Sequence, residues 1–311
     1  MSDSISMTDG LDVLDRGEAL VVGGGLAGVA AALTLAEAGA ETILVEERGA
    51  LGWEVPHGLE LFLAPNQDAP PVLRKMLDAL APKNAYRDGI LDPVGLELLL
   101  DDLVQAAGVR VHFRAFASGV DAARGIVRLT TKSGPLAVQA PALVDATEDS
   151  RLARAAGARF TGSTEAAQGR ALLVCAVEAP AGPERIEVDG LREVVVRPTL
   201  WPHEAHVSFV REPAEAARAE SDLRFAVARA VEGLRARGGG CAQANLSLSA
   251  HETFRLRVAK LDPESLPEKF HAAGPAVLGR KPSLQERARL GVEAASAALK
   301  QPAGAQLSPA R

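Results

Sequence analysis

The chain reads Glu18-Ala-Leu-Val-Val-Gly-Gly-Gly-Leu-Ala-Gly28, continues through an alanine-rich segment to Gly39, and then reaches Thr42-Ile-Leu-Val-Glu46. Each of the two apolar runs has the length of a short buried strand, and the alanine-rich segment between them favours a helix. The glycines stand where the first run ends, and an acidic residue stands where the second run ends. This order predicts a strand, a tight turn, a helix and a second strand.

The three glycines have the spacing Gly23-x-Gly25-x-x-Gly28, and each has a physical reason to be there. Gly23 allows a tight turn, Gly25 lets a pyrophosphate approach the backbone, and Gly28 lets the helix pack closely on the sheet. The helix N-terminus offers free N–H groups and the positive end of its dipole to phosphates. Glu46 follows Gly28 by 18 residues, near the spacing of a carboxylate that accepts ribose hydroxyls. The stretch predicts an adenine dinucleotide site; the alternative is a purely structural glycine turn.

The composition is that of an ordinary globular protein. The chain has 311 residues, of which 47% are hydrophobic and 24% charged, and this length allows two domains. A net charge of −6 argues against nucleic acid as a partner, and the cysteines Cys175 and Cys241 are too few for a disulfide framework or a zinc cluster. Without a signal-peptide pattern or a long uncharged apolar stretch, we expect no membrane span and a cytoplasmic location. The alanine-rich, aromatic-poor composition is typical of a GC-rich bacterial genome.

The remaining sequence predicts two further groups of elements. Asp92-Pro93 is a helix start, and a strand over 109–116 and a hairpin over 126–140 follow it. From about residue 160 the pattern changes to several strands and one long helix, which indicates a separate β-rich unit. A last helix is expected from about 283 to 300. It would close the first sheet from a distant part of the chain.

This discontinuous arrangement differs from a repeating NAD-binding βαβαβ domain and resembles the glutathione-reductase-like flavoprotein superfamily. A closer resemblance is to the FAD-dependent oxidoreductase family. Four segments carry this resemblance: Leu44-Val-Glu-Glu-Arg-Gly49 with Leu51-Gly52; Asp92-Pro93 and its leucine-rich helix; Val144-Asp-Ala-Thr-Glu-Asp-Ser-Arg-Leu-Ala153; and Leu278-Gly-Arg280 with Gly291-Val-Glu-Ala-Ala295. The resemblance covers residues 18–160 and, more loosely, 274–299.

The resemblance implies an α/β fold in which a discontinuous Rossmann-like FAD-binding domain carries an inserted, smaller β-rich α+β substrate domain. The expected limits are 18–159 and 273–300 for the FAD-binding domain, 160–272 for the substrate or cap domain, and flexible ends at 1–17 and 301–311.

Residue roles follow from the matching positions. The glycine turn and the start of its helix would meet the FAD pyrophosphate, Glu46 the adenosine ribose, and the backbone of Ala117 the adenine. The distal Gly279-Arg280 segment would lie near the ribityl chain and the flavin ring. The full set of expected cofactor-binding residues is Gly23, Gly25, Leu26, Ala27, Gly28, Glu46, Glu47, Arg48, Trp53, Ala117, Thr147, Gly279 and Arg280.

The chain departs from the family pattern at two places. Glu148 replaces a glycine where a backbone normally approaches the cofactor, and only a short segment separates Arg280 from Gly291. A partner subunit that completes the flavin site is therefore the alternative to an autonomous enzyme.

Catalytic side chains are harder to assign, because in such proteins the flavin carries the chemistry. The candidates are His57, which follows the second strand of the βαβ unit, and His251 and Arg255, which lie where the family faces its substrate. Each could instead be a solvated loop residue. His203 and His206 have a spacing that could suit a metal, but no further ligands complete a site, so we expect a pair on a sheet-edge surface and no metal.

The sequence thus predicts an FAD-dependent oxidoreductase that transfers hydride between a small organic substrate and flavin. One alternative is a flavoprotein-like subunit that works only in a heteromeric complex. A reductase that uses NAD(P) alone is the other, and both the 145–147 segment and the distal Gly279-Arg280 helix disfavour it.

Overall fold

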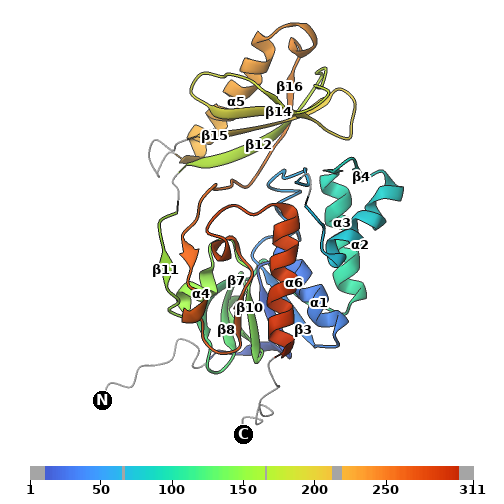
Figure 1. The fold of residues 1–311 in the computed structure, drawn as a ribbon. Coiled ribbons are helices and arrows are strands. Elements are labelled where there is room, and N and C mark those ends of the chain that lie inside the picture. The colour runs from blue at the N-terminus through green and yellow to red at the C-terminus, as the bar shows by residue number, and fades with distance from the viewer. Residues whose placement is uncertain (1–10, 65–66, 165–166, 212–218, 301–311) are drawn as a thin grey trace.

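The computed structural model describes residues 11–64, 67–164, 167–211 and 219–300 (Figure 1). At its centre lies a five-stranded parallel sheet with the order β18-β10-β2-β3-β6. The strands are β18 Phe270–Ala272, β10 Ala142–Asp145, β2 Ala19–Val22, β3 Thr42–Glu46 and β6 Arg110–Phe113. The side chains of β2 and β3 are buried throughout, as expected for a parallel sheet that is covered on both faces.

Alternate residues of these strands enter two different hydrophobic clusters. Val21 and Leu44 pack with four helices on one face, whereas Leu20 and Ile43 pack with a second β-layer on the other. The helices are α1 Leu26–Glu37, α2 Pro71–Leu80, α3 Pro93–Ala106 and α6 Leu284–Lys300. The second layer is the sheet β1-β9-β8-β7, with β1 Val13–Arg16, β9 Gly134–Gln139, β8 Ile126–Thr131 and β7 Phe116–Asp121. The short helix α4, Arg151–Ala155, joins that cluster.

Helices α1 and α6 lie side by side although they come from opposite ends of the sequence (Figure 1). Their backbones are so close that a Cβ on Gly291 would lie 2.0 Å from the carbonyl oxygen of Ala27. Glycine at 291 therefore allows the last helix to dock on the helix that follows the glycine turn. This docking places the first turn of α6 beside the N-terminus of α1.

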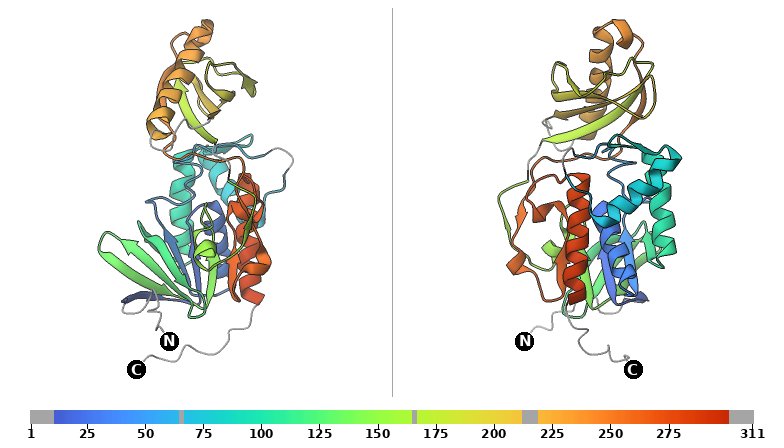
Figure 2. Two further views of the ribbon diagram at one scale, coloured as in Figure 1. Left: turned by 90° about the vertical axis from the view of Figure 1, so that its left-hand side faces the viewer. Right: turned by 45° about the vertical axis from the view of Figure 1, so that its right-hand side comes forward.

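A separate antiparallel sheet stands at one end of the molecule (Figures 1 and 2). Its order is β13-β14-β15-β12-β16, with β13 Glu184–Arg185, β14 Arg192–Pro198, β15 Glu204–Arg211, β12 Gln168–Cys175 and β16 Asn245–Ser249. Leu172 and Val174 of β12 face the helix α5, Ala219–Ala236, whereas Ala171 and Leu173 join the core of the larger body. One face of this sheet is thus covered by α5, and the other looks toward the parallel-sheet domain.

Two small strand pairs complete the fold. They are β4 Tyr86–Arg87 with β5 Ile90–Leu91, and β11 Phe160–Thr161 with β17 Lys260–Leu261. The second pair joins the two chain segments that lead to and from the antiparallel sheet.

The predicted fold class is confirmed: a parallel Rossmann-like sheet built from distant segments, with a β-rich unit inserted. Three details differ from the expectation. Residues 13–16 form a strand that pairs with β9, so the flexible arm does not reach residue 17. The strand expected over 109–116 breaks at Arg114, whose φ is 54°, into strands of two different sheets. Phe270–Ala272 belong to the parallel sheet and not to the inserted unit, because they pair with β10.

The other domain limits stay a prediction, and residues 1–10 and 301–311 lie outside the described ranges. Among the described residues, no helix combines the length and apolar character needed to cross a membrane.

Candidate functional site

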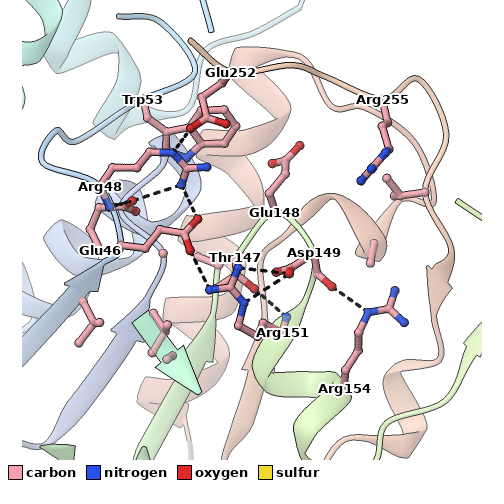
Figure 3. A pocket seen from close by; sticks show the side chains of 18 of the residues that line it. Glu46, Arg48, Trp53, Thr147, Glu148, Asp149, Arg151, Arg154, Glu252 and Arg255 are labelled. Carbon is pink, nitrogen blue, oxygen red and sulfur yellow. Dashed lines mark hydrogen bonds and ion pairs between the residues drawn. The ribbon is translucent and has the colours of Figure 1, made fainter. Parts of the chain in front are cut away.

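A cavity of about 280 Å³ opens at the carboxyl ends of β2, β3 and β10 (Figure 3). Gly23 lies at the end of β2, Glu46 at the end of β3, and Thr147 just beyond β10, while Ala117 of β7 closes one side. The carboxyl edge of a parallel sheet is where such folds bind their ligands. The volume lies at the small end of the range for ligand pockets.

The carboxylate of Glu46 is buried at the glycine turn and is only 1% exposed. One oxygen accepts the N–H of Gly24 at 2.5 Å, and the other accepts the N–H of Arg48 at 2.7 Å. A carboxylate has about four lone-pair positions, so acceptor capacity remains on the side that lines the cavity. Glu46 can thus accept hydroxyl groups from a ligand without losing its backbone partners.

The opposite wall is shaped by Asp145, the last residue of β10. Its buried carboxylate accepts the N–H of Thr147 at 3.0 Å, the hydroxyl of Thr147 at 2.6 Å and the N–H of Ala153 at 2.8 Å. Burial raises the pKa of Asp145, although these three hydrogen bonds act in the opposite direction. The turn is held against the glycine turn so closely that a Cβ on Gly23 would lie 2.6 Å from the carbonyl oxygen of Ala146.

Charged side chains of both signs line the cavity (Figure 3). Arg48 pairs with Glu252 at 2.7 Å and with Glu47 at 2.9 Å, and its guanidinium lies 4.3 Å from the centre of the Trp53 ring. Arg151 pairs with Glu47 at 2.8 Å from the other side. The residues that would face an adenosine-like ligand therefore form a connected network.

The N-terminus of α1 is not open to the cavity, because the side chain of Glu54 covers it. The N–H of Leu26 donates to both carboxylate oxygens of Glu54, at 3.1 and 3.0 Å. A Cβ on Gly25 would lie 2.5 Å from Oε1 of Glu54 and 3.0 Å from the indole nitrogen of Trp53. A carboxyl group of the chain itself thus lies where helix N-termini bind phosphate.

Glu54 is held from the opposite side by Arg287, in the first turn of α6. Their side chains are 2% and 3% exposed, and the closest nitrogen and oxygen are 3.2 Å apart. The same guanidinium pairs with Glu148 at 2.8 Å and lies 3.8 Å from Glu60. Burial raises the pKa of Glu54 to about 7, with Arg287 acting against the rise. Burial alone would lower the pKa of Arg287, but Glu148, Glu54 and Glu60 raise it above its ordinary value.

The predicted cofactor-binding residues fall into three groups. Seven line the cavity: Gly23, Glu46, Glu47, Arg48, Trp53, Ala117 and Thr147. Four belong to the start of α1: Gly25 and Leu26 are covered by Glu54, and Ala27 and Gly28 are buried in the helix packing. Gly279 and Arg280 do not line the cavity. Arg280 instead pairs with Glu286 and lines a second cavity.

The three candidate catalytic residues do not lie at one place in the structure. His57 and His251 come together, with ring centres 5.5 Å apart, and the carbonyl oxygen of His57 accepts the N–H of His251 at 2.8 Å. Arg255 is exposed at the rim of the cavity. The expectation of a surface histidine pair was wrong for His206, which is 3% exposed and whose Nε2 lies 2.9 Å from the carbonyl oxygen of Leu59. Burial lowers the pKa of His206 to about 3, so the ring is neutral.

Sequence reasoning missed Glu54 and Arg287. The available signals were a charged residue inside the otherwise apolar and small run Leu51-Gly-Trp-Glu-Val55 and an arginine on the inward face of the last helix. Glu148 was recognised as unusual, but its partner was not. Among the described residues, no group of three or more histidine, cysteine, aspartate or glutamate side chains could hold a metal ion.

A family model described as "FAD dependent oxidoreductase" matches residues 18–270. No curated protein matches the chain significantly in sequence.

Solved structures resemble the fold at low sequence identity. A geranylgeranyl bacteriochlorophyll reductase-like protein from Thermoplasma acidophilum is 16% identical, with 91% of this chain and 78% of that chain covered and a TM-score of 0.65. The p-nitrophenol 4-monooxygenase from Pseudomonas putida is also 16% identical, with 92% of this chain and 80% of that chain covered and a TM-score of 0.63. The myxobacterial chondrochloren halogenase is 15% identical, with 90% of this chain and 73% of that chain covered and a TM-score of 0.63. At these identities the likeness concerns the fold alone.

Proposed function

Because this chain belongs to the FAD-dependent oxidoreductase family, we propose that it transfers hydride between a small organic substrate and FAD. The observation that carries the proposal is the cavity at the carboxyl ends of β2, β3 and β10, with the Glu46 carboxylate in its lining. The flavin ring of bound FAD supplies the hydride acceptor or donor, and the chain supplies binding and orientation. A place in the glutathione-reductase-like superfamily is part of the same proposal, and the sheet built from distant segments supports it.

The adenosine half of FAD fits the residues present. Glu46 has acceptor capacity for ribose hydroxyls, and Ala117 leaves room beside the start of β7 for an adenine ring. Arg48 and Arg151 would remain paired with Glu47 at the rim. The diphosphate does not fit this conformation, because Glu54 holds the N–H group at the start of α1 that a phosphate would use.

The substrate would bind in the second cavity, of about 910 Å³, which lies between the 60–64 and 87–90 segments and the end of β14. Arg87 and Arg197 line it and donate to neutral partners, the carbonyl oxygen of Leu200 at 3.1 Å and the hydroxyl of Ser208 at 3.0 Å. Burial and then Arg185 lower the pKa of Arg197. These two cations can donate to a polar or anionic group of a substrate, beside the acids Glu60, Asp88 and Glu286 of the same lining.

His57 and His251 stay the sequence-based candidates for proton transfer and Arg255 for substrate contact, although none of the three lines the second cavity and Arg255 lines the first. Their support is the approach of the two rings to each other. The second candidate function is a subunit that acts only in a heteromeric complex. The carboxylate of Glu54 at the diphosphate position favours it, since a partner could be needed to open the site.

Purification distinguishes these candidates. We expect the protein to be yellow, or to become yellow when incubated with FAD, and to keep the flavin absorption bands through gel filtration. A colourless protein that cannot be reconstituted by FAD alone would overturn the autonomous enzyme. Reconstitution after a partner is added would support the second candidate.

Replacing Glu46 with glutamine tests the adenosine end directly. We expect the Kd for FAD to rise about tenfold or more, because hydrogen bonds to charged groups contribute about 1.5–3 kcal/mol each. Flavin fluorescence titration of the apoprotein measures this change. The matched control is Glu41→Gln, on the exposed residue just before β3, which should leave Kd unchanged. Equal affinities of Glu46→Gln and the wild type would remove Glu46 from the ribose site.

A further inference from the structure

We propose that Glu54 competes with the cofactor's diphosphate: its carboxylate closes the start of α1, and FAD binds only when this carboxylate moves away. The proposal rests on the proposed function, because it takes FAD as the ligand. It assigns to Glu54 and Arg287 a role in setting cofactor affinity.

The glycine turn has no room for both the Glu54 carboxylate and a diphosphate. Both oxygens of the Glu54 carboxylate accept the N–H of Leu26, the first residue of α1. The space beside Gly25, which a pyrophosphate would use, is filled by Oε1 of Glu54 at 2.5 Å from an ideal Cβ position. A phosphate oxygen and this carboxylate oxygen cannot share that place.

The ion cluster around Arg287 lies between the two cavities. Glu148 lines the first cavity and Glu60 lines the second, and Arg287 reaches both, at 2.8 and 3.8 Å. Glu54 and Arg287 are buried between these two acids. A dinucleotide with its adenosine in the first cavity and its flavin toward the second must pass through this cluster.

The charges of the cluster also allow Glu54 to be exchanged for a diphosphate. Glu54 shares Arg287 with two other acids, so its departure leaves the guanidinium paired with Glu148 and near Glu60. An incoming diphosphate carries negative charge and can take the vacated place beside Arg287 and the helix N-terminus. The exchange replaces one anion with another, so its outcome depends on how firmly Glu54 is held.

Binding of ADP and of adenosine to the apoprotein separates the diphosphate from the rest of the cofactor. We expect Glu54→Ala to bind ADP about tenfold or more tightly than the wild type, while adenosine affinity changes less than about twofold. Isothermal titration calorimetry measures both. Glu54→Gln keeps the side-chain volume and an acceptor for Leu26, so it separates charge from size and guards against misfolding of the alanine variant. The matched control is Glu37→Ala, at the exposed C-terminal end of the same helix.

The outcomes distinguish this proposal from the proposed function. Equal ADP affinity in the wild type and in both Glu54 variants would overturn competition by Glu54 but leave FAD binding intact. Weaker ADP binding in the variants would make Glu54 a ligand and overturn the proposal too. If no form of the protein binds ADP, adenosine or FAD, both the competition and the proposed function fail.

The competition has a pH signature. Because burial raises the pKa of Glu54 to about 7 in the closed site, a glutamate that moves into solvent releases a proton below that pH. We expect the wild-type Kd for FAD to fall about tenfold or more as the pH rises from about 5.5 to about 7.5. The charged groups that face Glu54 are Arg287 on α6 and Glu148 before α4, with Glu46 near the same turn.

Glu54→Gln is the reference for this profile, because it keeps every other titrating group. Its Kd should change far less over the same interval. A parallel profile in the two proteins would assign the pH dependence to another group and overturn displacement of Glu54.

The wild-type apoprotein should also lose stability over that interval. The contribution of Glu54 to stability is fully present below its ordinary pKa near 4.5 and is lost as the pH rises through about 7.

Discussion

Replacement of Arg287 by leucine should destabilise the folded protein by about 3–5 kcal/mol, the cost of removing one partner from a buried ion pair. Arg287 is only 2% exposed, and its guanidinium is the shared partner of Glu54, Glu148 and Glu60. Without it, three carboxylates face one another across a buried site. Urea unfolding followed by tryptophan fluorescence measures the change, and the ring of Trp53, 6.0 Å from this guanidinium, reports on the site.

A matched control lies two residues further along the same helix. Arg289 is exposed and donates to the carbonyl oxygen of Asp68 at 3.2 Å, so Arg289→Leu should cost less than about 1 kcal/mol. The double variant Glu54→Gln with Arg287→Leu should recover part of the loss, since neighbouring groups in one network are not additive. A single Arg287→Leu variant as stable as the wild type would contradict the account of the cluster.

Local motifs explain what could be predicted from the sequence. The strand, glycine turn, helix and acid of 18–46 lie within one continuous segment, so spacing alone predicted their arrangement. Asp92 likewise caps its helix by accepting the N–H of Gly95, as the Asp-Pro pair indicated. Seven of the predicted cofactor-binding residues line one cavity because they occupy the ends of neighbouring strands.

Long-range contacts explain what could not be predicted. The strand of residues 270–272 has too few residues for a periodic pattern, and its partner β10 lies far away in the sequence. Arg287 follows charged neighbours on a helix of mixed composition, so nothing local distinguishes its buried position from a solvated one. The direction of the Glu54 side chain depends on that arginine. Local motifs therefore predicted the glycine turn but not the Glu54–Arg287 pair that covers it.

The same limit applies to the distal glycine-arginine pair. Gly279, whose φ is 72°, lies beside Lys260, and Arg280 lines the second cavity, so their expected place near the flavin ring stays a prediction. What reaches the site from the C-terminal segment is the first turn of α6, through Arg287.

Replacement of Gly28 by alanine should destabilise the protein by about 3 kcal/mol or more and abolish ADP binding. An added Cβ would lie 1.7 Å from the carbonyl oxygen of Gly23, a backbone atom that cannot move alone, because the N–H of the same residue donates to Val45 at 2.8 Å. Helix α1 would have to shift away from the turn, and insertion of extra atoms into a packed site costs about 1–3 kcal/mol even where some relaxation occurs. Urea unfolding and ADP calorimetry measure the two effects. The matched control is Gly182→Ala, where an added Cβ has nothing within 4 Å and the backbone has no positive φ, so stability should stay within about 0.5 kcal/mol. If Gly28→Ala kept both stability and ADP affinity, the close approach of α1 to the turn could not be what shapes the adenosine end of the site.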